Sequence, residues 1–151
     1  MKRAALAFFI AAYGISYAAY AESLRPEQSD EKAAEIIKHL PYPDYPLPAD
    51  APALWVKLAQ NESPTLFLMP TELCGASDCK IIGFQNTSRG WKKIYEVFGG
   101  DSLEILNTKT QNHSDVVQHE SQGGGDFIIK TSHWNLDHYD DPIITKPERQ
   151  E

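Results

Sequence analysis

Basic residues are scarce and scattered in this chain. Its 151 residues include 14 lysines and arginines against 21 aspartates and glutamates, for a formal net charge of −7. Beyond the N-terminal segment, Lys92-Lys93 is the one pair of adjacent basic residues. Phosphate backbones and anionic membrane surfaces attract clustered lysine and arginine. The composition therefore excludes nucleic acid and anionic membranes as partners.

The sequence also lacks the short motifs that mark common catalytic centres. It contains neither a G-x-S-x-G nucleophile elbow nor an H-E-x-x-H zinc motif. The glycine run at residues 123–125 does not lie between a strand and a helix, so it predicts a turn rather than a phosphate cradle. We therefore expect no catalytic residues, no metal site and no cofactor, and a binding protein rather than an enzyme.

The first 21 residues have the layout of a secretory signal peptide. Lys2 and Arg3 precede an apolar stretch, and Ala19-Tyr20-Ala21 places small residues at a cleavage site. The stretch is shorter than the roughly 20 residues that a membrane-spanning helix needs, and no later apolar run approaches that length. The sequence thus predicts a periplasmic or secreted protein with no membrane insertion after cleavage.

Cleavage would leave residues 22–151, which we expect to form a single globular domain of high negative charge. Without Lys2 and Arg3, 12 basic residues face 21 acidic ones, a net charge of −9. Such a field steers a cationic protein partner toward the surface, although the same charge also serves solubility alone. We expect the ends of the domain, residues 22–28 and 142–151, to be frayed. The sequence leaves the oligomeric state open.

Two cysteines, Cys74 and Cys79, stand close together in the segment CGASDC. Four residues separate them, which excludes a C-x-x-C redox motif, and no further cysteine or histidine follows at zinc-ligand spacing. Because export places the chain in an oxidising compartment, we expect one disulfide that staples a hairpin.

The segment of residues 29–40 predicts one amphipathic helix. Ala33, Ile36, Ile37 and Leu40 recur at helical spacing and form one apolar face. Ser29 is the expected N-cap, and Pro41 follows the last residue. Residues 41–52 contain five prolines and predict an extended strap.

The remainder of the chain predicts a meander of about six to seven antiparallel strands. Short runs of apolar and β-branched residues alternate with turn residues, and no strand–helix–strand repeat occurs. The fold class expected is therefore α+β, mainly antiparallel β. The predicted strands cover residues 53–59, 65–70, 80–87, 91–98, 102–108, 115–121 and 126–134.

Four of the five histidines lie near the C-terminal end, among several carboxylates, and suggest zinc as an alternative. A four-residue loop between Ser121 and Asp126 would put His113 and His133 on opposite faces of the sheet, so they could not share an ion. A bulge at the glycines would shift this register by one residue. The full set comprises His113, Asp115, His119, Glu120, His133, Asp137, His138, Asp140 and Asp141.

The segment from Cys74 to Tyr139 resembles a group of small exported bacterial proteins. The matching stretches are CGASDCKIIGF, RGWKKIYEVF, ILNTKTQNHSDVV and WNLDHY. In that group a CG-x-x-x-C hairpin opens a β-meander that closes with an aspartate-glycine turn, which Asn135-Leu136-Asp137 replaces here. Some members are similar to binding proteins for cell-wall enzymes, including immunity proteins. The resemblance implies the β-meander and the exported location.

Acidic and aromatic residues coincide in residues 134–141, which we predict to form the partner-binding surface. Trp134 and Tyr139 would anchor the partner, while Asp137, Asp140 and Asp141 would steer it. The function expected is that of an inhibitor or immunity protein for a cationic enzyme directed at the cell envelope. The alternatives are a metal-dependent hydrolase using the histidine-rich end and an envelope accessory protein.

Overall fold

The computed structural model describes residues 23–25, 30–75, 78–100 and 102–147. The predicted signal peptide, residues 1–21, lies outside the described residues. Within them, one short α-helix and one 3-10 turn accompany eleven strands. In chain order these are β1 (Ser23–Leu24), α1 (Glu31–Ile37), β2 (Ala53–Val56), β3 (Thr65–Leu68), η1 (Thr71–Leu73), β4 (Lys80–Thr87), β5 (Gly90–Phe98), β6 (Leu103–Thr110), β7 (His113–Gly123), β8 (Asp126–Ser132), β9 (Trp134–Asn135), β10 (His138–Tyr139) and β11 (Ile143–Thr145).

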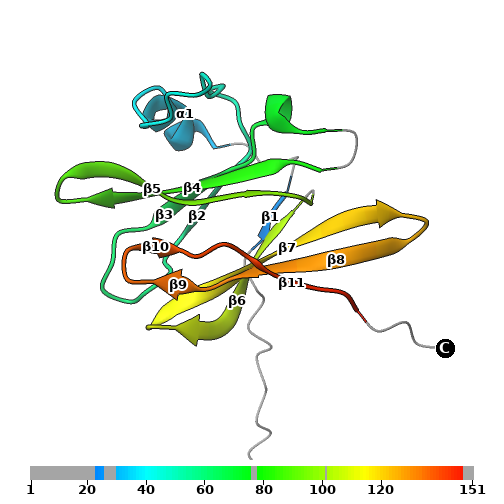
Figure 1. The fold of residues 1–151 in the computed structure, drawn as a ribbon. Helices are drawn as coiled ribbons and strands as arrows, with labels where there is room; N and C mark the ends of the chain where they lie inside the picture. Colours follow the sequence, from blue (N-terminus) through cyan, green and yellow to red (C-terminus); the bar gives the residue numbers. More distant parts are fainter. Residues whose placement is uncertain (1–22, 26–29, 76–77, 101, 148–151) are drawn as a thin grey trace, which may run out of the picture.

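The strands form two main antiparallel sheets and one small hairpin (Figure 1). One sheet has the order β2-β3-β4-β5 and the other the order β1-β6-β7-β8-β11, while β9 pairs only with β10. Neighbours in sequence are mostly neighbours in space, so the predicted mainly antiparallel meander is confirmed. Its division into two sheets was not predicted, because local alternation does not reveal where one sheet stops.

The four-stranded sheet is covered on both faces, which explains the unbroken apolar run of β3. Phe67 faces the core between the two sheets, whereas Leu66 and Leu68 face a second apolar cluster on the opposite side. All four residues of β3 are buried. A strand covered on both faces needs no polar alternation.

Helix α1 and the proline-rich strap supply the second cover. Ala33 and Ile37 of α1 are buried against the outer face of the sheet, as the apolar stripe predicted. Tyr42 of the strap is also buried there, and its hydroxyl donates to Glu96 at 3.0 Å. In Figure 1 α1 accordingly lies over the β2–β5 sheet, on the side away from β6–β8.

The helix is shorter than predicted. Its N-cap is Asp30, whose carboxylate accepts from the Ala33 backbone amide at 2.8 Å, while the predicted cap Ser29 lies outside the described residues. It ends at Ile37 because the next amides, His39 and Leu40, bond three residues back and tighten the last turn.

The disulfide is confirmed: Cys74 and Cys79 are bonded and form an isolated antiparallel bridge before β4. The Cys79 carbonyl accepts from Gly99, and its amide donates to Gly100. The staple thus joins the loop to the end of β5.

Parts of the predicted frayed ends are ordered strands. Ser23 and Leu24 pair with β6, and Leu24 is fully buried in the core. Ile143, Ile144 and Thr145 pair with β8 at the other edge of the same sheet. The sequence did not reveal β1 and β11, because two and three residues are too few for a periodic signal. Among the described residues, no helix has the length and apolarity to cross a membrane.

Candidate functional site

The hairpin of β9 and β10 packs against β5, β6 and β7 and carries the predicted partner-binding residues. Asn135 pairs with His138 and Trp134 with Tyr139, so Leu136 and Asp137 form the turn. The Asp137 amide donates to the Asn135 carbonyl at 2.6 Å, across a single residue. We call residues 134–141 the acidic hairpin.

Leu136 stands at the tip of the acidic hairpin in an unusual conformation. Its φ angle is +59°, in the left-handed region that normally favours glycine. A hydrogen bond across one residue of positive φ is a γ-turn of the rare, strained kind. The leucine is also 81% exposed, the highest exposure among the large hydrophobic residues described. Neither feature stabilises the fold, so the position suggests a functional role.

The backbone of Leu136 is held on both sides, by an exposed turn residue and by a buried ring. Its amide donates to the Gln111 side-chain oxygen at 2.9 Å, and its carbonyl accepts from the Trp134 indole at 3.2 Å. Lys92 of β5 forms an ion pair with Asp137 and also donates to the Asp137 carbonyl. The tip is therefore a preformed turn held by both β5 and the β6–β7 turn.

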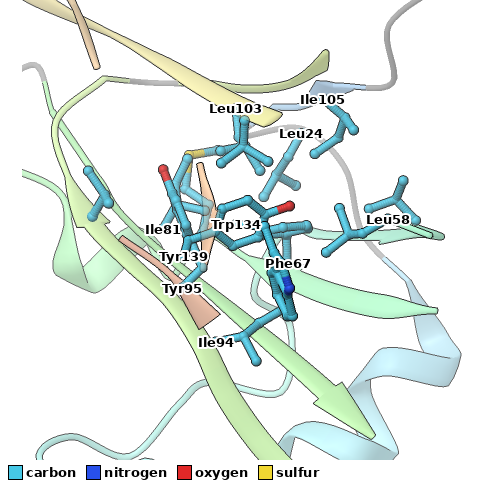
Figure 2. Packing of buried hydrophobic residues seen from close by; sticks show 14 of the residues in the cluster. Leu24, Leu58, Phe67, Ile81, Ile94, Tyr95, Leu103, Ile105, Trp134 and Tyr139 are labelled. Carbon is cyan, nitrogen blue, oxygen red and sulfur yellow. The ribbon is translucent and has the colours of Figure 1, made fainter. Parts of the chain in front are cut away.

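The two predicted anchors lie inside the protein. Trp134 is 4% exposed and Tyr139 is 6% exposed, and Figure 2 shows both rings among the core side chains. The Tyr139 hydroxyl donates to the Ser114 carbonyl at 2.6 Å, and burial raises the pKa of this phenol. Both rings support the acidic hairpin from beneath, so a partner that meets this surface contacts other residues.

The three predicted steering residues are exposed. The Lys92 ammonium and the His138 ring hold the pKa of Asp137 below its ordinary value, and the carboxylate stays ionised. Asp140 accepts from the Asn135 side chain at 2.9 Å, and Asp141 follows it at the surface. The acidic hairpin thus exposes three carboxylates, of which Asp137 is paired with Lys92.

Sequence reasoning missed Leu136 as the exposed apolar residue of this surface. Trp134 and Tyr139 were predicted as anchors because their rings are large, although large aromatic rings are highly buried on average. The available signal was the replacement of a glycine-type turn by Asn135-Leu136-Asp137. A leucine at a turn position that demands positive φ has no conformational reason to be there.

The histidine-rich set is divided into separate pairs. The unbulged register is wrong and the bulged alternative is confirmed: Ser121 pairs with Phe127, and Asp126 pairs with Gly123, because a bulge at the glycines shifts β7 against β8 by one residue. Each of the four histidines lies beside a different carboxylate. The pairs are His113 with Glu62, His133 with Asp115, His119 with Glu104, and His138 with Asp137 and Asp140. Among the described residues, no three His, Cys, Asp or Glu side chains group around a common metal position.

Asp115, which pairs with His133, is the buried carboxylate among these pairs. Burial favours protonation of Asp115, but hydrogen bonds from His133, Thr108 and Thr110 outweigh it and hold the pKa of Asp115 below its ordinary value. The Thr110 hydroxyl lies 3.2 Å from His133 Nδ1, the nitrogen that also meets Asp115 at 2.9 Å. A nucleophile would have to face the other ring nitrogen, so these three side chains are not a catalytic relay.

Comparison with known proteins adds no functional assignment. No protein-family model matches the chain, and no curated protein or solved structure is significantly similar to it.

Proposed function

We propose that this protein is exported and binds a cationic protein through the acidic hairpin, acting as an inhibitor or immunity protein for an envelope-directed enzyme. The observation that carries the proposal is Leu136: 81% exposed, strained at φ +59°, and held rigidly at the tip. The disulfide Cys74–Cys79 supports an oxidising, extracytoplasmic compartment.

Rigidity is the first argument for binding. A preformed loop avoids the ordering cost that a flexible loop meets on association. Hydrogen bonds on both sides of Leu136 supply that order in the free protein. The exposed Leu136 side chain on this ordered turn fits a concave site on a partner. Full burial of one apolar side chain there contributes about 1.5–3 kcal/mol.

Charge is the second argument. Asp140 and Asp141 are exposed in the acidic hairpin, Asp140 bonds to Asn135 next to the tip, and the chain carries a net charge of −7. Exposed carboxylates around an apolar anchor accelerate encounter with a positively charged partner and place the anchor at its cleft. We therefore propose a partner whose cleft has an apolar floor and a basic rim.

The test is capture and inhibition with matched variants. The exported protein is immobilised and exposed to purified cationic enzymes that cleave the cell wall, and bound enzyme and residual enzyme activity are measured. Wild type should retain and inhibit at least one such enzyme, and Leu136→Ala should lose about tenfold or more in affinity.

Ile144→Ala is the control, because Ile144 is also an exposed aliphatic residue (57%) but lies on β11, away from the hairpin. It should bind as wild type does. Equal loss in both variants, or full binding by Leu136→Ala, would refute the assignment of the hairpin as the binding surface.

A further inference from the structure

His113 lies beneath the acidic hairpin, between two groups that can only accept hydrogen bonds. Its Nε2 is 2.8 Å from a carboxylate oxygen of Glu62, and its Nδ1 is 2.9 Å from the Gln111 carbonyl. The other oxygen of Glu62 already accepts from Gln85 at 2.6 Å. A neutral imidazole has one N–H, whereas the protonated ring has two. Only the protonated ring can donate to both neighbours.

The same histidine contacts both residues that hold Leu136. Its ring stacks on Trp134 with centroids 4.0 Å apart and planes within 9°. Trp134 donates to the Leu136 carbonyl, and the Gln111 side chain accepts from the Leu136 amide. A protonated ring on an indole face adds a cation–π attraction. Both groups that bond to the Leu136 backbone thus contact one titratable side chain, while Lys92 of β5 holds Asp137 independently of it.

We infer that His113 is a pH-dependent support of the acidic hairpin, which holds the Leu136 tip in its binding conformation when the ring is protonated and loosens it when the proton leaves. The direction of this pH dependence follows from the two groups that accept hydrogen bonds from the ring, Glu62 and the Gln111 carbonyl. Loss of the proton removes one of the two donated hydrogen bonds and the cation–π attraction. The inference rests on the proposed function, because the tip that His113 supports is the proposed binding element.

Other titratable groups surround this ring and set the conditions of the test. Glu62 faces it from the loop between β2 and β3, and Lys109 of β6 lines the same surface hollow as Glu62. Asp115 and His133 form the neighbouring pair, and the Tyr139 phenol lies within electrostatic range of Glu62 and Asp115. Histidine side chains in general respond between about pH 5 and 8, so the test must distinguish His113 from His133 and His138.

The experiment follows hydrogen exchange of the Leu136 amide by NMR in the exported protein, without a partner, across this pH range. Rates are corrected for the intrinsic dependence of exchange on hydroxide. Protection of the Leu136 amide should fall about tenfold or more with rising pH, with the same midpoint as the ring signals of His113.

Two variants identify the responsible ring. In His113→Gln the pH dependence of Leu136 protection should disappear, whereas His138→Gln, which alters an exposed histidine beside the tip, should retain it. Protection that does not change with pH, or that follows the midpoint of His133 or His138, overturns the inference. Because no partner is present, a failure here is distinct from a failure of the capture test, which bears on the proposed function alone.

Discussion

Replacement of Leu136 by glycine, compared with replacement by alanine, separates the backbone strain at the tip from the role of the side chain in binding. Leu136 has φ +59° and makes its only described polar contacts through its backbone. Glycine adopts this conformation without a Cβ clash and keeps both backbone hydrogen bonds. The substitution therefore removes strain and the exposed side chain together.

The expected change in stability follows from two opposing terms. A non-glycine residue in the left-handed region loses about 1–2 kcal/mol relative to the right-handed one. Glycine increases the entropy of the unfolded chain, which offsets about 0.4–1 kcal/mol of that gain. Because the side chain is 81% exposed, its removal costs little burial. The difference between the two terms runs from near zero to about 1.6 kcal/mol. We therefore expect the free energy of unfolding of Leu136→Gly to exceed that of wild type by about 0.5–1 kcal/mol.

Urea denaturation of wild type, Leu136→Gly and Leu136→Ala measures these terms. Alanine keeps the Cβ and thus the strain, so Leu136→Ala should unfold at nearly the same midpoint as wild type, and Leu136→Gly at a higher one. Both variants should bind the partner more weakly. A Leu136→Gly protein that is less stable than the alanine variant would refute the strained tip, since the leucine would then contribute to the fold.

Three other changes test the surrounding structure. Gly83→Ala should destabilise by about 1–3 kcal/mol in urea, because its Cβ would lie 2.8 Å from the Phe67 ring. The lowered pKa of Asp115 stabilises the fold above about pH 4 and this contribution is lost as pH falls further. Asp115→Asn should therefore cost about 1–3 kcal/mol at pH 7 and much less at pH 2.5, measured by thermal melting at both values. Cys79→Ala opens the disulfide and should lower stability by about 2 kcal/mol without abolishing the fold, a difference visible in the urea midpoint.

The strands β3 to β8 were predictable because each carries its own local signal. Alternation or a short apolar run marks each strand, and glycine or polar residues mark the turns. The end of β8 is an exception: the predicted strand continued to Trp134, whereas the structure ends β8 at Ser132 and starts β9 at Trp134. The acidic hairpin begins after that break, and no turn residue in the local sequence indicates it.

The pairing register of the strands could not be predicted from the pattern of apolar and turn residues. The number of residues in a hairpin loop does not reveal a bulge, and three glycines in succession permit several registers. The observed shift of one residue moves His133 beside Asp115, where β6 also bulges between Ile105 and Lys109. Long-range pairing of this kind depends on packing between strands rather than on the sequence of either one.

The candidate surface was predicted in part. Residues 134–141 do carry exposed carboxylates, but the size of Trp134 and Tyr139 suggested anchors where the structure has core residues. Residue type alone does not distinguish these cases, because a hairpin of two-residue strands directs alternate side chains inward and outward according to its contacts. Leu136 became visible only with its backbone angle and exposure.

Binding kinetics at low and high salt test the central claim, that the acidic hairpin binds a cationic protein. Against the enzyme captured by wild type, Asp140→Asn/Asp141→Asn should slow association and reduce its salt dependence, and Leu136→Ala should mainly speed dissociation. Asp44→Asn/Asp50→Asn changes two exposed carboxylates of the strap by the same charge and should leave both rates near those of wild type. If the strap variant loses binding while both hairpin variants bind as wild type does, the acidic hairpin is not the interface.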